Sequence, residues 1–446
     1  WREFQGGDLQ GIAAHLDYLE EMGVDLVYVN PINASPSTHK FDATDFYHVD
    51  PAFGGDAALH ELVDALHRRG MRIIVDASFN HCHPRFFAFQ DVMEKGPDSE
   101  YWDWFTVHEH PIKVRFRPHI LSPEEAEKYA RYLEWFHTLP QTTGIPIEET
   151  DGEGALVEPT YRAWYGVPTM PKLNLHNPET RAYFLDVAAH WLREFGIDGW
   201  RMDVARQISP DFWVDFRRVT KAVRPDCYLL CEIWGNTSPW LQGDQFDATM
   251  NYLMRDLCVD YFGKGTMDTR TFVDGLARML TLYAPQVTAV LQNLFSSHDV
   301  ARFRHVAGGE MQRLRAATLL QMTLPGAPGI YYGDEIGMSG GDDPDNRRPF
   351  PWHAPEEWDR DMLAFTRTLT HLRRAHPALR HGGFRPLWVG EEGFAFLRVH
   401  GEERAVVVIC REAGADRLKL PVATGSPTLL WGNAEVTTKG DQLIVE

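Results

Sequence analysis

Between residues 11 and about 335, the sequence repeatedly sets a short, apolar, β-branched run after an amphipathic stretch. None of these runs alternates between apolar and polar residues, so each predicts a strand that is buried on both faces. Such strands alternating with helices are typical of a parallel sheet covered by helices, and the pattern therefore predicts an α/β fold. The predicted strands are 26–31, 72–77, 199–204, 228–233, 246–250, 289–295 and 330–333.

Two of the intervening helices have clear boundaries. A helix is predicted over 178–195, because Asn177 is a natural N-cap, Pro178 fits the first helical position and Gly196 provides the stop. A second helix is predicted over 56–69.

Seven strands are one too few for a closed (β/α)8 TIM barrel, and an open parallel edge would leave backbone groups unpaired. Residues 11–22 have the pattern of a helix that follows a first strand, so that strand would precede Trp1. We therefore expect a (β/α)8 barrel whose first strand is missing from this chain.

Two regions interrupt the βα rhythm. Residues 82–170 are rich in Pro, Trp, Tyr and His and lack a clear period, which predicts a subdomain inserted after barrel strand 3. After about residue 381 only short strands are expected, which predicts a C-terminal antiparallel β-sandwich. The predicted domains are a barrel formed by 1–81 and 171–380, the inserted subdomain at 82–170 and the sandwich at 381–446. The predicted sandwich strands include 394–399, 405–409 and 428–431.

The charge balance excludes some partners. The chain has 44 Lys and Arg against 63 Asp and Glu, a net charge of −19, and would repel a nucleic acid or an anionic membrane. Five scattered cysteines without a CxxC pair predict reduced thiols and a cytoplasmic location. Because the chain opens at Trp1 rather than Met, the sequence does not test for a signal peptide. It predicts no oligomeric state.

Carboxylates and histidines recur where predicted strands end, which is where a parallel barrel places its active site. Arg201 and Asp203 are two residues apart on one strand, so their side chains face the same way and the cation would keep the carboxylate ionised. The clusters are DASFNH at 76–81, GIDGWRMDVA at 196–205, CEIW at 231–234 and FSSHD at 295–299.

Three carboxylates from different strand ends, Asp203, Glu232 and Asp299, fit glycoside cleavage. One must attack the anomeric carbon, one must protonate the leaving oxygen, and the third can stabilise the transition state. Glu232 is the expected acid, because burial and two neighbouring Asp charges would raise its pKa. A single carboxylate at a strand end is more often a helix cap or an ion pair, but four clusters in barrel order are more specific.

These four clusters, in this order, resemble the signature regions of the α-amylase superfamily, glycoside hydrolase family 13. MPKLN at 170–174 is similar to the fifth signature of its neopullulanase, cyclomaltodextrinase and maltogenic amylase branch. The resemblance implies that Asp203 is the nucleophile, Glu232 the acid/base and Asp299 the transition-state stabiliser. Further segments that resemble this branch are 6–12, 35–46, 238–252 and 342–352.

The resemblance also implies a set of sugar-binding residues. Neutral histidines suit this task, since they donate hydrogen bonds to hydroxyl groups without adding a charge. Phe41 stands where relatives have Tyr, so ring stacking is kept and a phenolic hydrogen bond is lost. Arg206 and Gln207 stand where relatives usually have Asn and Glu, which leaves the acceptor specificity open. The implied sugar contacts are His39, Phe41, His81, Arg201, Trp234, His298, Asp343 and Arg347.

The resemblance further implies structural Ca²⁺ at two places, one near the inserted subdomain that uses Asn80 and another that uses Gly6 and Asp8 with earlier acidic residues. Calcium needs six to eight oxygens, and that many are not identifiable in the sequence. The HCH run at 81–83 has no second ligand pair, so it does not predict zinc. No organic cofactor is expected.

The main hypothesis is a retaining α-glucan hydrolase that cleaves α-1,4 bonds of maltooligosaccharides, cyclodextrins, starch or pullulan. Cleavage of α-1,6 bonds as well is an open alternative within this hypothesis. An alternative is a transglycosylase or a sucrose or trehalose isomerase that uses the same covalent intermediate. A remoter alternative is an inactive glucan-binding homologue, although such a protein would be expected to lose part of the triad.

Overall fold

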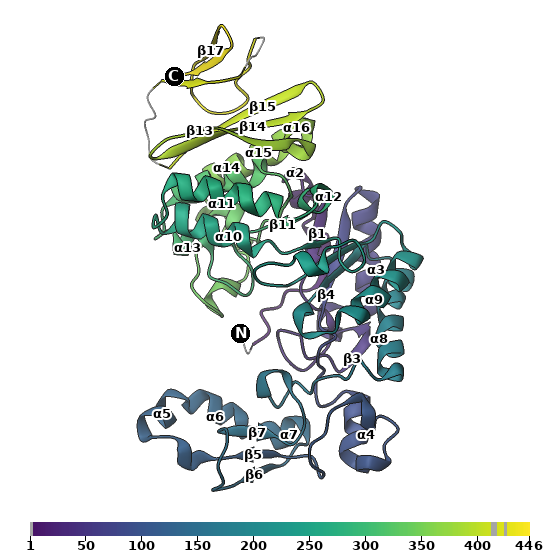
Figure 1. The fold of residues 1–446 in the computed structure, drawn as a ribbon. Helices are drawn as coiled ribbons and strands as arrows, with labels where there is room; N and C mark the ends of the chain where they lie inside the picture. Colours follow the sequence, from purple (N-terminus) through teal and green to yellow (C-terminus); the bar gives the residue numbers. More distant parts are fainter. Residues whose placement is uncertain (1–2, 412–416, 423–425) are drawn as a thin grey trace.

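The computed structural model describes residues 3–411, 417–422 and 426–446 (Figure 1). Within them, five parallel strands pair in the order β1-β4-β8-β9-β10, and β11 pairs in parallel with β12. A parallel bridge between Met250 and Gln292 links the two groups. The strands are β1 (Leu26–Val29), β4 (Arg72–Ala77), β8 (Gly199–Met202), β9 (Tyr228–Cys231), β10 (Ala248–Thr249), β11 (Gln292–Asn293) and β12 (Ala327–Pro328).

Six of the seven predicted strands are confirmed, and the seventh is wrong. A strand was expected at 330–333, but β12 is formed by Ala327–Pro328. The side chains of the expected strand have other contacts in the structure. Ile330 packs against side chains of the neighbouring helices, and the rings of Tyr331 and Tyr332 lie against the guanidinium of Arg302. The apolar signal therefore comes from packing after the strand, while the strand itself has no β-branched residue.

Helices pack around this sheet. The helix predicted over 178–195 is confirmed as α8 (Pro178–His190), which continues into one π-helical turn, Trp191–Phe195. The Asn177 side chain accepts from two backbone amides of its first turn, and Gly196 ends it with φ 70°. The other long helices are α3 (Gly55–Arg68), α9 (Pro210–Val223), α11 (Thr269–Thr281), α14 (Met311–Thr323) and α15 (Arg360–Ala375).

The parallel ladder has two free edges. Within the described residues, β1 pairs only with β4, and β12 pairs only with β11. Short helices α1 (Leu9–Ala14) and α2 (Leu16–Glu21) precede β1, in the region where a helix was expected.

Part of the chain between β4 and β8 forms a lobe at the bottom of the view in Figure 1, which contains α4 to α7 and β5 to β7. A three-stranded sheet in the order β6-β5-β7 lies in it, together with short helices. The limits 82–170 of an inserted subdomain stay a prediction. The elements are α4 (Phe87–Lys95), β5 (Val114–Phe116), α5 (Pro123–Lys128), α6 (Ala130–Phe136), α7 (Leu139–Thr143), β6 (Ile147–Glu149) and β7 (Val157–Pro159).

The C-terminal part forms two antiparallel sheets, as predicted. One sheet contains β13 (Gly383–Val389), β14 (Gly393–His400) and β15 (Glu403–Cys410). The second contains β16 (Leu418–Leu420), β17 (Val436–Lys439) and β18 (Gln442–Val445). Ala395 of the first sheet packs against Leu418, Leu420 and Leu443 of the second. The strand expected at 428–431 is wrong, because that segment is irregular in the structure.

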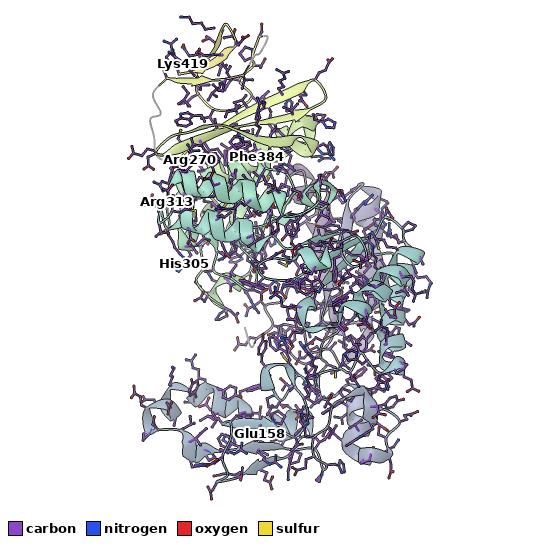
Figure 2. All side chains as sticks on the ribbon, viewed as in Figure 1. Glu158, Arg270, His305, Arg313, Phe384 and Lys419 are labelled. Carbon is purple, nitrogen blue, oxygen red and sulfur yellow. The ribbon has the colours of Figure 1, made fainter. Side chains whose placement is uncertain are left out.

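The first of these sheets also packs on the helices of the sheet domain. Phe384 of β13 lies against the apolar cluster that α11 and α14 share with β14 and β15 (Figure 2). In the described residues, no helix combines the length and the apolar character needed to cross a membrane.

Candidate active site

The side chain of Arg201 lies at the centre of the three predicted catalytic carboxylates. It is in β8, fully buried, and its Nη1 lies 3.0 Å from Asp203 Oδ1. Its Nη2 lies 3.6 Å from Glu232 Oε2 and 3.8 Å from Asp299 Oδ2. The structure therefore brings together Asp203 after β8, Glu232 after β9 and Asp299 after β11, at the carboxyl ends of the parallel strands.

Asp76 holds the other side of Arg201, and sequence reasoning assigned it no role. Asp76 pairs with Arg201 in the register of β4 and β8, and its Oδ1 accepts from Arg201 Nη1 at 3.0 Å. Tyr28 donates to its Oδ2 at 2.6 Å. Burial raises the pKa of Asp76 to about 7, although Arg201 opposes this. The signal in the sequence that could have identified Asp76 is an ionisable residue inside a predicted strand that is otherwise mostly apolar.

Asp203 and Glu232 face the same guanidinium, at 3.0 and 3.6 Å from the two terminal nitrogens of Arg201. Burial raises the pKa of Asp203 well above its usual range, despite Arg201. Burial also acts to raise the pKa of Glu232, but Arg201, the Trp234 indole and the Val204 amide outweigh it and lower this pKa. This lowered pKa corrects the expectation of a raised pKa for Glu232, because the sequence could not show how many donors face each carboxylate.

The donors to Glu232 are held in fixed positions. Trp234 Nε1 donates to Glu232 Oε1 at 2.8 Å, and the backbone amide of Val204 donates to Oε2 at 3.0 Å. Val204 has φ 40°, which is a strained conformation for a β-branched residue. The Trp234 ring stacks on Tyr252 with centroids 3.9 Å apart, and it is 45% exposed. Sequence reasoning missed Tyr252 and Val204.

The predicted sugar-binding histidines lie beside the carboxylates. The Phe41 ring stacks between His39 and His298, and His298 Nε2 lies 3.2 Å from Asp299 Oδ2. Burial lowers the pKa of His39, lowers that of His81 to about 3, and lowers that of His298 well below its usual range. All three imidazoles are therefore neutral at pH 7, as expected from the sequence.

Asp343 and Arg347 form an ion pair of 3.2 Å on the loop after β12. Arg347 Nε also donates to the backbone carbonyl of His298 at 2.8 Å. This loop therefore lies against the segment that contains His298 and Asp299. Burial raises the pKa of Asp299, and Arg201 opposes this effect.

The candidate calcium ligands belong to two predicted sites, Asn80 to one and Gly6 with Asp8 to the other. Asn80 is buried, its Oδ1 has no hydrogen-bond partner, and its Nδ2 lies 3.2 Å from His81 Nδ1. Asp8 instead caps α1, where its carboxylate accepts from the Gly11 amide at 2.6 Å, and Gly6 precedes it on the N-terminal segment. Among the described residues, no three His, Cys, Asp or Glu side chains are arranged to bind a metal ion.

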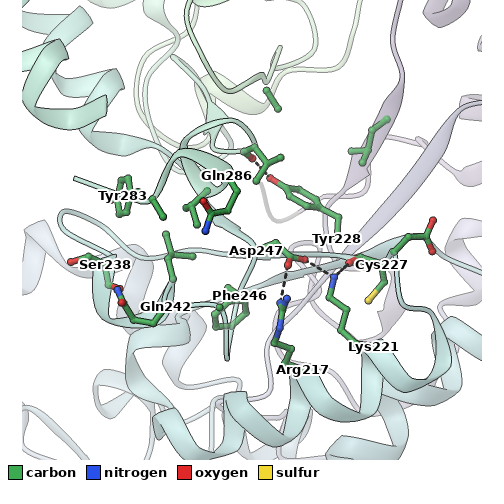
Figure 3. Close-up of a pocket in the computed structure, with 18 of the residues that line it drawn as sticks. Arg217, Lys221, Cys227, Tyr228, Ser238, Gln242, Phe246, Asp247, Tyr283 and Gln286 are labelled. Atoms are coloured by element: carbon green, nitrogen blue, oxygen red, sulfur yellow. Dashed lines mark hydrogen bonds and ion pairs between the residues drawn. The ribbon is translucent and has the colours of Figure 1, made fainter. Parts of the chain in front are cut away.

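A pocket of about 770 Å³ lies at the opposite end of the strands (Figure 3). Its lining includes the first residues of β1, β4 and β9. Asp247 accepts from Arg217 at 2.8 Å and from Lys221 at 2.9 Å, so these polar groups of the pocket are already paired with one another. The catalytic groups therefore lie at the other end of the sheet.

Comparisons with known proteins agree with this arrangement. The model of the alpha amylase catalytic domain matches residues 2–382. The chain is 39% identical over 421 residues to a cyclomaltodextrinase of Geobacillus thermopakistaniensis, covering 94% of this chain and 64% of the relative. It is 40% identical over 408 residues to neopullulanase 2 of Thermoactinomyces vulgaris, covering 91% and 63%. This chain thus spans less than two thirds of the length of both relatives.

A solved structure is similar along most of its length. The cyclic α-maltosyl-(1→6)-maltose hydrolase of Arthrobacter globiformis, in complex with that cyclic sugar, superposes with a TM-score of 0.81 at 33% identity. The match covers 94% of this chain and 85% of the hydrolase.

Proposed function

Because this chain belongs to the α-amylase family, we propose that it is a retaining hydrolase of α-1,4-glucosidic bonds in maltooligosaccharides, cyclodextrins, starch or pullulan. The observation that carries the proposal is the single buried Arg201 that faces Asp203, Glu232 and Asp299. One cation between three carboxylates allows them to lie close together despite their mutual repulsion.

In the proposed reaction, Asp203 attacks the anomeric carbon and forms a covalent glucosyl ester. Glu232 donates a proton to the leaving glycosidic oxygen, and Asp299 stabilises the positive charge of the transition state. A water molecule then gives its proton to Glu232 and attacks the same carbon, which releases Asp203. Two inversions give net retention. The contact of both Asp203 and Glu232 with the one guanidinium of Arg201 supports this class, since an inverting enzyme needs room for water between its carboxyls.

The reaction needs one proton on Glu232. In the free protein, burial raises the pKa of Asp203, while Arg201, the Trp234 indole and the Val204 amide lower that of Glu232. A sugar that enters between the two side chains would separate them and leave the charge on Asp203 beside Arg201. We propose that the proton then resides on Glu232, where the leaving oxygen accepts it.

Neutral histidines then position the sugar. His39, His81 and His298 offer ring N–H groups to hydroxyls without competing electrostatically with the acid, since their pKa values are lowered. Phe41 stacks between two of these rings and supplies an apolar face. The ion pair of Asp343 and Arg347 offers one acceptor and one donor to the same sugar.

The substrate class rests on the names of the relatives. A cyclomaltodextrinase, a neopullulanase and a hydrolase of a cyclic α-1,6-linked maltose dimer all resemble this chain. We therefore propose that the substrates are neutral α-glucans and that α-1,6 bonds are also accepted.

A product profile on maltotriose, β-cyclodextrin and pullulan tests the proposal. We expect all three to be cleaved, panose to appear from pullulan, and proton NMR to show the α-anomer first. The β-anomer as the first product would contradict the mechanism. Absence of cleavage of all three sugars would favour an inactive glucan-binding protein instead.

Transfer to a second sugar is the competing activity, and one observation favours it. Trp234 presents an exposed ring beside Glu232, where an acceptor sugar could stack. The same covalent intermediate would then yield a transglycosylase or a sucrose or trehalose isomerase. Longer oligosaccharides that dominate at high maltose concentration would support transfer, and free reducing sugar would support hydrolysis.

The barrel is proposed to be eight-stranded, with a further strand between β1 and β12. The free edges of these two strands support this, because the backbone groups along an open parallel edge need partners. An experimental structure in which β1 and β12 pair directly would contradict it. We propose that residues 82–170 are the inserted subdomain of this barrel.

Calcium binding stays a prediction. One unpartnered amide oxygen on Asn80 falls far short of six to eight oxygens, so the described residues do not fit the ion and no proposed step uses it. A melting temperature that calcium raises and Asn80→Ala makes insensitive to calcium would support the site.

A cytoplasmic location is also proposed, supported by five cysteines that form no disulfide.

A further inference from the structure

The segment with His298 and Asp299 lies outside any ladder and needs donors for its backbone carbonyls. Within the described residues, the only backbone pairing of this segment is one antiparallel bridge, Ser297 to Val300. Ser297 and His298 are buried, while Asp299 is exposed and Val300 half-buried. The carbonyls of the two buried residues therefore need hydrogen-bond donors from another segment.

Asn346 provides these hydrogen bonds. Its side chain is fully buried, and its Nδ2 donates to the carbonyls of Ser297 at 3.2 Å, His298 at 3.0 Å and Val300 at 3.0 Å. These three carbonyl oxygens also fix the orientation of the Asn346 amide. They would repel the amide oxygen if it took the place of the nitrogen.

Arg302 links the same two segments, but here the donor follows the turn and the acceptors lie on the loop. It is fully buried, its Nε donates to the Asn346 carbonyl at 3.0 Å, and its backbone amide donates to Gly340 at 3.0 Å. Its guanidinium also packs over the rings of Tyr331 and Tyr332. These contacts connect the turn to the loop after β12, so a shift of either segment by itself would break hydrogen bonds to the other.

We infer that Asn346 is a positioning residue, which acts through the turn to fix Asp299 and His298 relative to Asp343 and Arg347. The inference rests on the proposed function of Asp299. The turn holds the carboxylate that faces the transition state, and the loop holds the ion pair proposed to bind the sugar. Misplacement of a catalytic group by about 1 Å can cost roughly 100-fold in rate.

A double-mutant cycle tests this inference on maltotriose hydrolysis. Asn346→Ala should lower kcat about 10- to 100-fold with a smaller change in KM. In an Asp299→Asn background it should lower kcat by less than about 2-fold, because the group that it positions is already lost. Asn346→Ser, which keeps one donor, should lie between Asn346→Ala and the parent.

Gln321→Ala is the matched control. Gln321 is a buried amide whose Nε2 donates to the carbonyls of Asn293 and Gly329, away from the turn. Loss of equal factors in both backgrounds, or a loss no larger than that of Gln321→Ala, would overturn the inference. Asp299→Asn by itself tests the proposed function, so failure of that function is recognised separately. Melting temperatures establish that each variant is folded.

Discussion

At the scale of single residues, Arg201 allows four acidic side chains to occupy one buried site. It contacts Asp76, Asp203, Glu232 and Asp299, and its own side chain has no exposure to solvent. The cost of burying a cation is offset only because several carboxylates surround it. The pKa of Arg201 stays well above its usual range, so it remains charged throughout the reaction.

Asp203→Asn and Glu232→Gln should each lower kcat on maltotriose by roughly 10³-fold or more, since the first removes the nucleophile and the second the acid. Both substitutions keep side-chain shape, so the melting temperature should stay within a few degrees. Steady-state kinetics and thermal unfolding measure the two effects. Residual turnover within 10-fold of the parent would refute the assigned roles.

A second residue-scale prediction concerns Glu335, which lies far from these carboxylates in the sequence. It is buried, Tyr18 donates to its Oε1 at 2.8 Å, and burial raises its pKa to about 7. The folded state therefore holds a proton that the unfolded state releases above about pH 4.5, so this stabilisation is complete at low pH and is lost as pH rises through 7.

Glu335→Gln should remove that dependence. Between pH 5 and 7, the free energy of unfolding of the variant should fall less steeply than that of the parent, by at most about 1.4 kcal/mol per pH unit. Urea unfolding across this range measures the difference. Parallel curves for the two proteins would show that Glu335 does not titrate there.

At the scale of elements, α14 ends against two buried arginines that join it to neighbouring segments. Arg373 of α15 donates to the carbonyls of Met322 and Leu324, and Arg398 of β14 donates to that of Thr323. These are carbonyls that the last turn of a helix leaves unpaired, at its negative end. Burial, and then repulsion from Arg380, lowers the pKa of Arg373 to about 10. Burial, and then repulsion from Arg373, lowers that of Arg398 to about 9.

Arg398→Met should destabilise the protein by roughly 3 to 5 kcal/mol, because several buried carbonyls lose their only charged donor. Arg385→Met, at an exposed position of β13, is the matched control and should cost about 0.5 kcal/mol or less. Urea unfolding measures both. Equal effects would mean that the contacts of Arg398 contribute little.

At the scale of the whole molecule, the first C-terminal sheet and helices of the sheet domain share one apolar cluster. Phe394 and Phe396 of β14 and Ile409 of β15 belong to the same apolar cluster as Leu276 of α11 and Leu320 of α14. Side chains of the C-terminal sheet and of the helices bury this cluster together, so neither part has a separate core where the two meet.

A chain that ends at Gly382 should therefore lose stability rather than keep an intact catalytic part. Removing β14 and β15 exposes apolar side chains of α11 and α14, and we expect a melting temperature lower by at least 10 °C, or aggregation. Thermal unfolding and size-exclusion chromatography measure this. A monomeric truncated chain that melts with the parent would show that the two parts fold independently.

The sequence by itself determined the α/β class, six of the seven parallel strands, helix α8 and the residues at the strand ends. Those features depend on local periodicity, capping residues and turn chemistry, which neighbours along the chain decide. The strand at 330–333 was misplaced because apolar residues after β12 pack against Arg302 and a helix, and periodicity cannot distinguish such packing from a strand.

Tertiary structure alone decided which side chains of the candidate site contact one another. The register of β4 against β8 places Asp76 beside Arg201, and the approach of Trp234 and Val204 to Glu232 reverses the expected order of the two pKa values. Asn346 reaches the Asp299 turn from a loop almost 50 residues away. Electrostatics and hydrogen bonding at a buried site depend on distances between segments remote in sequence, and no pattern along one chain contains those distances.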